Sequence, residues 1–248
     1  MTFDPTLVAA AFIAASFIGL AKGGLHIASM FAVPTLSLVM PPITAAATLL
    51  PVLMASDVVG LLSYRRTVER RLVILLLPAA LGGVALGWAT AAMVSTGAVM
   101  VVIGLTGVVY CLARWFAVQS TGARRPSSLA GVFWGALSGF TSFVSHAGGA
   151  PWQIYMSPQR LDPPTFAGTT VVIFSIVNAV KVAPYVALGG FQTQTLRLSL
   201  ALIPVALAAA FAGIWLTRTV PEAVFYRILD AALFLVSLKL ILDGVFAG

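Results

Sequence analysis

The chain has 248 residues, of which 60% are hydrophobic and only 8% are charged. About a quarter of the residues of a soluble domain are charged, so this chain has too few polar groups to cover a water-facing surface. Several apolar stretches reach the roughly 20 residues that a helix needs to cross a bilayer, whereas the short alternating strands of an outer-membrane barrel are not found. The composition predicts an all-α polytopic membrane protein.

The net charge of +7 has its origin in arginines at the ends of apolar stretches. They are not interleaved with aromatic residues on a polar face, so we expect no nucleic-acid partner. Basic residues beside membrane spans mark cytoplasmic loops. We expect a multi-pass protein of the bacterial inner membrane, with the lipid bilayer as a partner and its first apolar stretch retained as a helix. The arginines concerned are Arg65, Arg66, Arg70, Arg71, Arg114, Arg124 and Arg125.

Apolar periodicity and length predict eight membrane spans and two shorter pieces. As helices the shorter pieces, 25–40 and 150–161, would measure about 24 and 18 Å, which is less than the hydrocarbon core of about 30 Å. We interpret both as re-entrant or broken half-helices, which membranes tolerate where protein or a polar cavity covers the backbone. The predicted spans are 6–22, 43–64, 72–92, 97–118, 128–145, 165–190, 197–217 and 223–246.

The two halves of the sequence resemble each other. "PPITAAAT" at 41–48 matches "PPTFAGTT" at 163–170, and "RRLVILLLPAALGG" at 70–83 matches "LRLSLALIPVALAA" at 196–209. Before them in each half, "KGGL" near Lys22 matches "HAGGA" at 146–150, and all three matches follow the same order. We predict a first repeat at 1–118, a cytoplasmic linker at 119–128 and a second repeat at 129–248. Four spans per half would give a parallel repeat, and five crossings would give an inverted one.

Each short piece begins at a glycine pair. Glycine at the start of a half-helix leaves backbone N–H groups without intrahelical partners, and the helix dipole adds positive potential there. With no Cβ in the way, an oxyanion can approach closely. We predict an anion cradle, with close packing of small residues as the alternative. The glycines are Gly23, Gly24, Gly148 and Gly149.

Charged and polar residues inside apolar stretches are the other candidates for substrate binding. Lys22 adjoins the first glycine pair and His146 occupies the matching place in the second half, while His26 is a weaker candidate. A snorkelling lysine and a packing histidine are the alternatives. On one predicted helix, Thr170 and Lys181 share a face, with Asn178 nearby. Such groups are costly in lipid unless they line a polar path. We expect an ion pair or a coupling site at Asp57, with Lys181 as its natural partner, and weaker roles for Thr48 and Gln153.

The glycine run at 22–24, "PTL" at 34–36 and the pattern formed by Pro42, Ala45 and Thr48 resemble the TauE/SafE family. The resemblance extends over nearly the whole chain, including its duplication. It implies a transporter of sulfur-containing anions such as sulfite or small organosulfonates, working by alternating access at the repeat interface. No cofactor or metal is implied, and a homodimer is compatible with this interpretation.

Energetics favours export, because a monovalent anion leaving a negative cytoplasm gains about 2.3 kcal/mol per 100 mV. The alternative is an importer of organic anions coupled to protons or sodium. An intramembrane enzyme is less expected, because Ser145 and His146 are adjacent and point about 100° apart on a helix, and no second buried acid is evident. A cation channel or metal-ion transporter is also less expected, because only seven acids are present.

Overall fold

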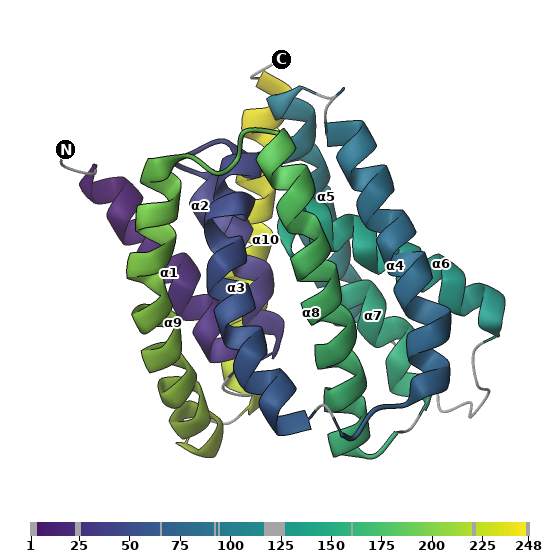
Figure 1. Ribbon diagram of the computed structural model, residues 1–248. Helices are drawn as coiled ribbons and strands as arrows, with labels where there is room; N and C mark the ends of the chain where they lie inside the picture. The colour runs from purple at the N-terminus through teal and green to yellow at the C-terminus, as the bar shows by residue number, and fades with distance from the viewer. Residues whose placement is uncertain are drawn as a thin grey trace.

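The computed structural model describes residues 4–22, 26–64, 66–91, 93, 95–116, 127–159, 161–219 and 222–246 (Figure 1). These residues form helices and no β-strand, which confirms the all-α class. The elements are α1 (Pro5–Lys22), η1 (His26–Phe31), α2 (Ala32–Ser37), α3 (Pro42–Tyr64), α4 (Arg70–Ala91), α5 (Thr96–Phe116), α6 (Ser128–Ser145), α7 (Gly149–Met156), η2 (Ser157–Gln159), α8 (Pro163–Ala187), α9 (Thr193–Thr219) and α10 (Glu222–Phe246), with η denoting a 3-10 helix.

The long helices account for the predicted spans. Six of them, α1, α3, α4, α6, α8 and α9, are long and apolar enough to cross a membrane. In α5 the apolar part is the shorter stretch Gly97–Leu112, and α10 occupies the last predicted span. A multi-pass helical membrane protein is therefore the class that both the sequence and the structure support.

Short helical pieces stand where the sequence predicted interruptions. The first consists of η1 and α2, six residues each, and the second of α7 followed by η2. Both are packed inside the protein: Phe31 and Leu36 of the first piece and Trp152 and Met156 of the second are almost inaccessible. Protein therefore covers these short segments on at least one face.

Two central helices, α3 and α8, run antiparallel. The backbone of Tyr64, at the end of α3, lies against Gly168 near the start of α8. At the other end, Ile43 and Ala47 lie against Gly190, just beyond α8. Figure 1 shows the two helices side by side in the centre of the bundle. Residues early in α3 therefore lie beside residues late in α8, and residues late in α3 lie beside residues early in α8.

Small residues allow the outer helices to approach closely. A methyl group at Gly83 of α4 would overlap the carbonyl of Ala136 in α6, and one at Gly139 of α6 would overlap the carbonyl of Ala80 in α4. Gly19 of α1 lies in the same way against α9. Membrane helices commonly associate through such small-residue faces. This contact fixes α6, and with it the residues at the end of α6, against the rest of the bundle.

The connection between α3 and α4 is held against the start of α8. The hydroxyl of Thr67 donates to the carbonyl of Pro164 over 3.0 Å, and the backbone N–H of Glu69 donates to the hydroxyl of Thr169 over 2.9 Å. In Figure 1 this connection lies at the bottom of the bundle, and both ends of the chain lie at the top. Arg66, Arg70 and Arg71 belong to the bottom end, which is called the arginine end below.

Candidate functional site

Polar side chains of α8 form a buried row that faces α3 and α6. Asn178, Lys181 and Tyr185 are spaced three and four residues apart, which places them on one face of a helix. All three are at most 5% exposed. Because α8 starts at the arginine end, the row runs from Asn178 towards the opposite end of the bundle. Its partners divide it into three levels.

The first level is an ionic cluster around Asp57 of α3. Nζ of Lys22 lies 2.7 Å from Oδ1 of Asp57, and Nδ2 of Asn178 donates to Oδ2 over 2.6 Å. The side chain of Asp57 is 5% exposed and that of Lys22 is 35% exposed. The expectation that Lys181 is the ion-pair partner of Asp57 was wrong. Lys22, at the end of α1, reaches the carboxylate instead.

The second level is centred on the ammonium group of Lys181, whose residue has no exposed surface. Its Nζ atom donates to the carbonyl and to the hydroxyl of Ser142, at 3.0 and 3.1 Å. It lies 3.0 Å from Nδ1 of His146. An ammonium group has three hydrogens, so these three contacts use all of them. A ligand that binds to Lys181 must therefore replace at least one of them.

His146 follows the last residue of α6 and has a left-handed backbone conformation. Its φ is 54°, a region that non-glycine residues seldom adopt. The backbone N–H of His146 donates to Ser142, and that of Ala147 donates to Thr141, so the chain leaves the helix with its last carbonyls satisfied. This turn brings the imidazole between α3 and α8.

The groups around the imidazole of His146 indicate which ring nitrogen carries the hydrogen. Nε2 lies 2.9 Å from the carbonyl of Ala46 in α3, which only accepts, so Nε2 carries the hydrogen. Nδ1 lies 3.0 Å from Nζ of Lys181 and 3.1 Å from the carbonyl of Ser142. With the hydrogen on Nε2, Nδ1 accepts from the ammonium group of Lys181. The arrangement favours a neutral imidazole, because an imidazolium would place a second positive charge 3.0 Å from the ammonium group. His146 thereby links α3 to α8 through Lys181.

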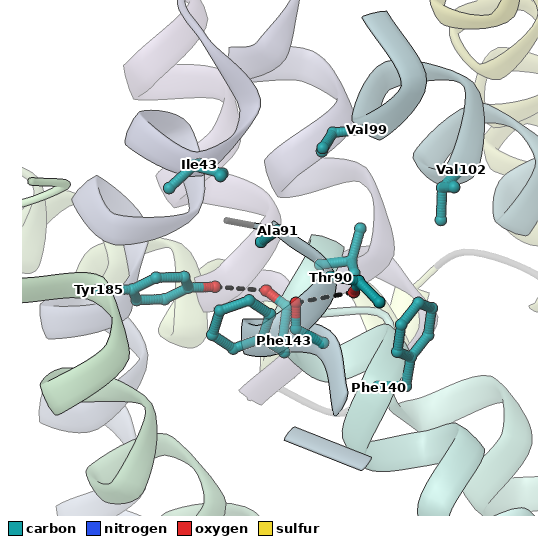
Figure 2. A pocket seen from close by; sticks show the side chains of 10 residues that line it. Ile43, Thr90, Ala91, Val99, Val102, Phe140, Phe143 and Tyr185 are labelled. Carbon is teal, nitrogen blue, oxygen red and sulfur yellow. Dashed lines mark hydrogen bonds between the residues drawn. The ribbon is translucent and has the colours of Figure 1, made fainter. Parts of the chain in front are cut away.

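The third level is aromatic and closes the row. The hydroxyl of Tyr185 donates to the carbonyl of Phe143. The two rings stack with their centroids 5.0 Å apart, and the Tyr185 ring meets the His146 ring edge-on at 6.3 Å. Beyond this level is an apolar pocket, shown in Figure 2, in which Tyr185 points towards Phe143 across the wall.

Other predicted residues lie outside this row or have local partners. Thr48 donates to the carbonyl of Thr44 in its own helix. Thr170 donates to its own helix and accepts from the indole of Trp152, so it does not join Lys181. Gln153 is exposed on α7. In the described part of the chain, the hydrogen-bond partners of Lys181 are Ser142 and His146, so none of these three side chains is among them.

The glycine pair of the second half is divided between two environments. Gly148 is buried, and a methyl group on it would lie 2.6 Å from the carbonyl of Ser138. The Gly148 carbonyl also accepts from the Ser138 hydroxyl over 2.7 Å, so this glycine serves close packing. Gly149 is exposed, and a methyl group added to it would meet no atom within 4 Å. Gly23 and Gly24 and the side chain of His26 lie outside the described residues.

Sequence reasoning missed Ser142, Phe143 and Tyr185. Ser142 and His146 are four residues apart, as are Lys181 and Tyr185, and that spacing places each pair on one helix face. This spacing was a usable signal. Serine and aromatic residues are nevertheless ordinary components of membrane helices, and only contacts between α6 and α8 distinguish these three.

Together the helices and this row define a class, namely multi-pass membrane proteins that bury charges between their helices. Intramembrane charges of this kind mark paths for ions and polar solutes. The family model described as "Sulfite exporter TauE/SafE" matches residues 7–240, and the chain belongs to this family. The family is one of membrane transporters of sulfur-containing anions. No curated protein and no solved structure matches the chain.

Proposed function

We propose that the chain exports sulfite or a small organosulfonate by alternating access, with the anion bound beside Lys181. The observation that carries this proposal is the charge of the buried row. Lys22 and Lys181 contribute two positive charges, Asp57 contributes one negative charge, and His146 is neutral in its assigned state. One positive charge thus remains among the described residues of the row. A monovalent anion would neutralise it, and a cation would not.

The groups around Lys181 suit an oxyanion. An entering oxygen can take over an ammonium hydrogen from Ser142, whose hydroxyl then becomes a donor itself. Hydrogen bonds between charged groups are shorter and about twice as strong as neutral ones, so a sulfite or sulfonate oxygen competes well with a carbonyl. Ser175, one turn before Asn178, adds a buried hydroxyl with no partner among the described residues.

The glycine cradle remains part of the proposal. Gly149 starts α7, and its open surroundings leave room for an oxyanion near the backbone. Gly23 and Gly24 are proposed as its counterpart in the first half. Gly148 is proposed as a binding residue only through its backbone, because its α-carbon is packed against Ser138.

An inverted repeat would allow the binding site to open alternately to the two sides of the membrane. If α1 to α5 correspond in order to α6 to α10, exchanging the halves converts the α4–α6 contact into the α9–α1 contact, and both are extensive. The self-corresponding pairs α3–α8 and α5–α10 are also in contact. Both run antiparallel, with Gly244 near Gly97 and Ser237 near Gly104 in the second pair. These contacts support an axis in the membrane plane, as inverted-repeat transporters have.

The direction follows from the arginine end and the membrane potential. Basic residues favour the cytoplasmic side. The Asp57 level then lies towards the cytoplasm, and the aromatic level lies towards the outside of the cell. Export of a monovalent anion is then driven by about 2.3 kcal/mol per 100 mV. Import coupled to protons or sodium is the second candidate, with Asp57 and His146 as the residues that would couple it.

Counterflow of labelled sulfite in proteoliposomes tests the proposal. We expect uptake that is accelerated by an inside-positive potential and needs no proton or sodium gradient. Lys181→Met keeps the length of the side chain and removes the charge, so it should abolish flux. Lys239→Met is the matched control, because Lys239 is exposed on α10 and pairs with Asp243. Full flux in Lys181→Met, or none with any anion in the wild type, would refute the proposal.

A further inference from the structure

An apolar pocket of about 240 Å³ lies at the end of the bundle away from the arginines. Figure 2 shows its side chains converging from the start of α3, the end of α4, the start of α5 and the facing turns of α6 and α8. Its one lining hydroxyl besides that of Tyr185, on Thr90, donates to the carbonyls of Leu86 and Gly87 in its own helix. The lining offers contacts to hydrocarbon and no free charged group. It consists of Ile43, Gly87, Thr90, Ala91, Val99, Val102, Phe140, Phe143, Val144 and Tyr185.

This pocket and the Lys181 site share a wall. Tyr185 lines the pocket and also meets the ring of His146, which contacts Lys181. Phe143 lines the pocket, and the residue before it, Ser142, accepts from Lys181. The described hydrogen bond across this wall runs from the Tyr185 hydroxyl to the Phe143 carbonyl. Breaking that bond and turning one ring would join the apolar pocket to the ammonium group.

We propose that the pocket is a subsite for the hydrocarbon part of an organic anion, whose charged head group binds at Lys181 when the Tyr185 ring moves aside. The inference rests on the proposed anion transport and adds a substrate class to it. The preferred substrates are sulfonates that carry an aliphatic chain, rather than inorganic sulfite. A bare oxyanion gains nothing from apolar walls, whereas each buried methylene contributes about 0.8 kcal/mol.

A homologous series from methanesulfonate to pentanesulfonate measures this contribution. A sulfonate stays charged near neutral pH, so the series changes chain length at constant charge. The half-saturating concentration for competition with labelled sulfite in proteoliposomes should fall about fourfold per methylene, which is the 0.8 kcal/mol above converted at 1.36 kcal/mol per tenfold. The fall should stop when the chain outgrows the pocket.

Two variants of α4 localise the effect. Ala91→Phe fills the pocket, because Ala91 lines it, and should bring the pentanesulfonate to methanesulfonate ratio close to one. Ala89→Phe adds the same ring on an exposed position of the same helix and should keep the wild-type ratio. If Ala91→Phe does not fold, the wild-type series still decides, because it requires no variant.

The possible outcomes distinguish failure of the proposed subsite from failure of the proposed anion transport. If sulfite is transported but all sulfonates compete equally, the subsite is refuted, and a lipid chain becomes the occupant to test for the pocket. The same conclusion follows if Ala91→Phe and Ala89→Phe give the same ratio as the wild type. If no anion is transported or competes, the proposed function itself fails, and the subsite fails with it.

Discussion

Nζ of Lys22 lies 2.7 Å from Oδ1 of Asp57, which joins the end of α1 to the middle of α3. The other carboxylate oxygen accepts from Asn178, so a third helix, α8, is tied to the same group. The two charges differ in their surroundings, because the carboxylate is buried while about a third of the lysine side chain is exposed. Their removal should therefore have unequal consequences.

Lys22→Ala should destabilise the protein more than the double variant Lys22→Ala/Asp57→Asn. The single change leaves a buried carboxylate with only Asn178 as a partner, and an unsatisfied buried group costs about 1–3 kcal/mol. In the double variant the carboxylate is replaced by a neutral amide. Thermal unfolding in detergent measures the order. Equal stability of the two variants would show that the carboxylate of Asp57 carries no penalty when it is left without Lys22.

His146→Asn should reduce anion flux about ten- to hundredfold while the protein still folds. Asparagine tolerates the left-handed conformation of this position, but its side chain is too short to contact both Ala46 and Lys181. Losing a charge-assisted hydrogen bond is worth about 1.5–3 kcal/mol. Flux in proteoliposomes at equal protein content measures the loss. Unchanged flux would remove His146 from the site.

Ser145→Ala is the matched variant for His146→Asn and also tests the enzyme alternative. The Ser145 hydroxyl donates to the Thr141 carbonyl in its own helix, so its removal should leave transport and stability nearly unchanged. A serine nucleophile would instead be essential. Loss of all activity in Ser145→Ala, together with labelling of Ser145 by a covalent serine probe, would favour intramembrane catalysis.

The long apolar helices and several buried polar residues of the candidate site could be predicted from the sequence because apolar length and misplaced charge are local properties. Lys181, Asn178 and His146 stood out as polar groups in apolar stretches, and the structure brings all three into one row. The partner of Asp57 could not be found in this way. A helical wheel gives the direction of a side chain but not the helix that faces it, so Lys22 of α1 was not recognised as that partner.

Backbone packing explains why the glycine pairs and Tyr185 were interpreted less well from the sequence. The glycine pairs were interpreted as openings for a ligand, but whether a glycine faces a cavity or a neighbouring helix depends on the position of that helix. Gly148 faces α6 and Gly149 does not. Tyr185 was overlooked for a related reason, because an aromatic residue in an apolar span becomes informative only when its hydroxyl reaches the carbonyl of Phe143.

Gly83→Ala should destabilise the protein by about 1–3 kcal/mol, the usual cost of overpacking. The added methyl group would overlap the Ala136 carbonyl, and backbone on both helices would have to shift. Gly82→Ala is the control on the neighbouring residue, where a methyl group meets nothing within 4 Å. It should be neutral, or stabilising by up to about 1 kcal/mol through helix propensity. Equal melting temperatures for the two variants would contradict the close α4–α6 contact.

Asp162 caps the start of α8, outside the apolar span that begins at Pro164. Its carboxylate accepts from the backbone N–H of Thr165 over 3.1 Å. The hydrogen bonds from Thr165 lower the pKa of Asp162 below its ordinary value of 3.8. A carboxyl group with a lowered pKa stabilises the folded state above its unfolded pKa, and this contribution is lost as the pH falls through the folded value.

Asp162→Ala should therefore lower the melting temperature at neutral pH, because the helix loses its cap. The difference from the wild type should shrink as the pH falls below about 3.8, and it should be lost once the pH has passed the lowered pKa of the folded state, where the folded carboxylate is protonated as well. Asp162→Asn keeps a capping side chain without a titratable group, so it should retain most of the stability and lose the pH-dependent part. Melting curves of the three proteins in one detergent, recorded from neutral to acidic pH, give the comparison. A pH-independent difference between Asp162→Ala and the wild type would show that the cap does not depend on the charge of Asp162.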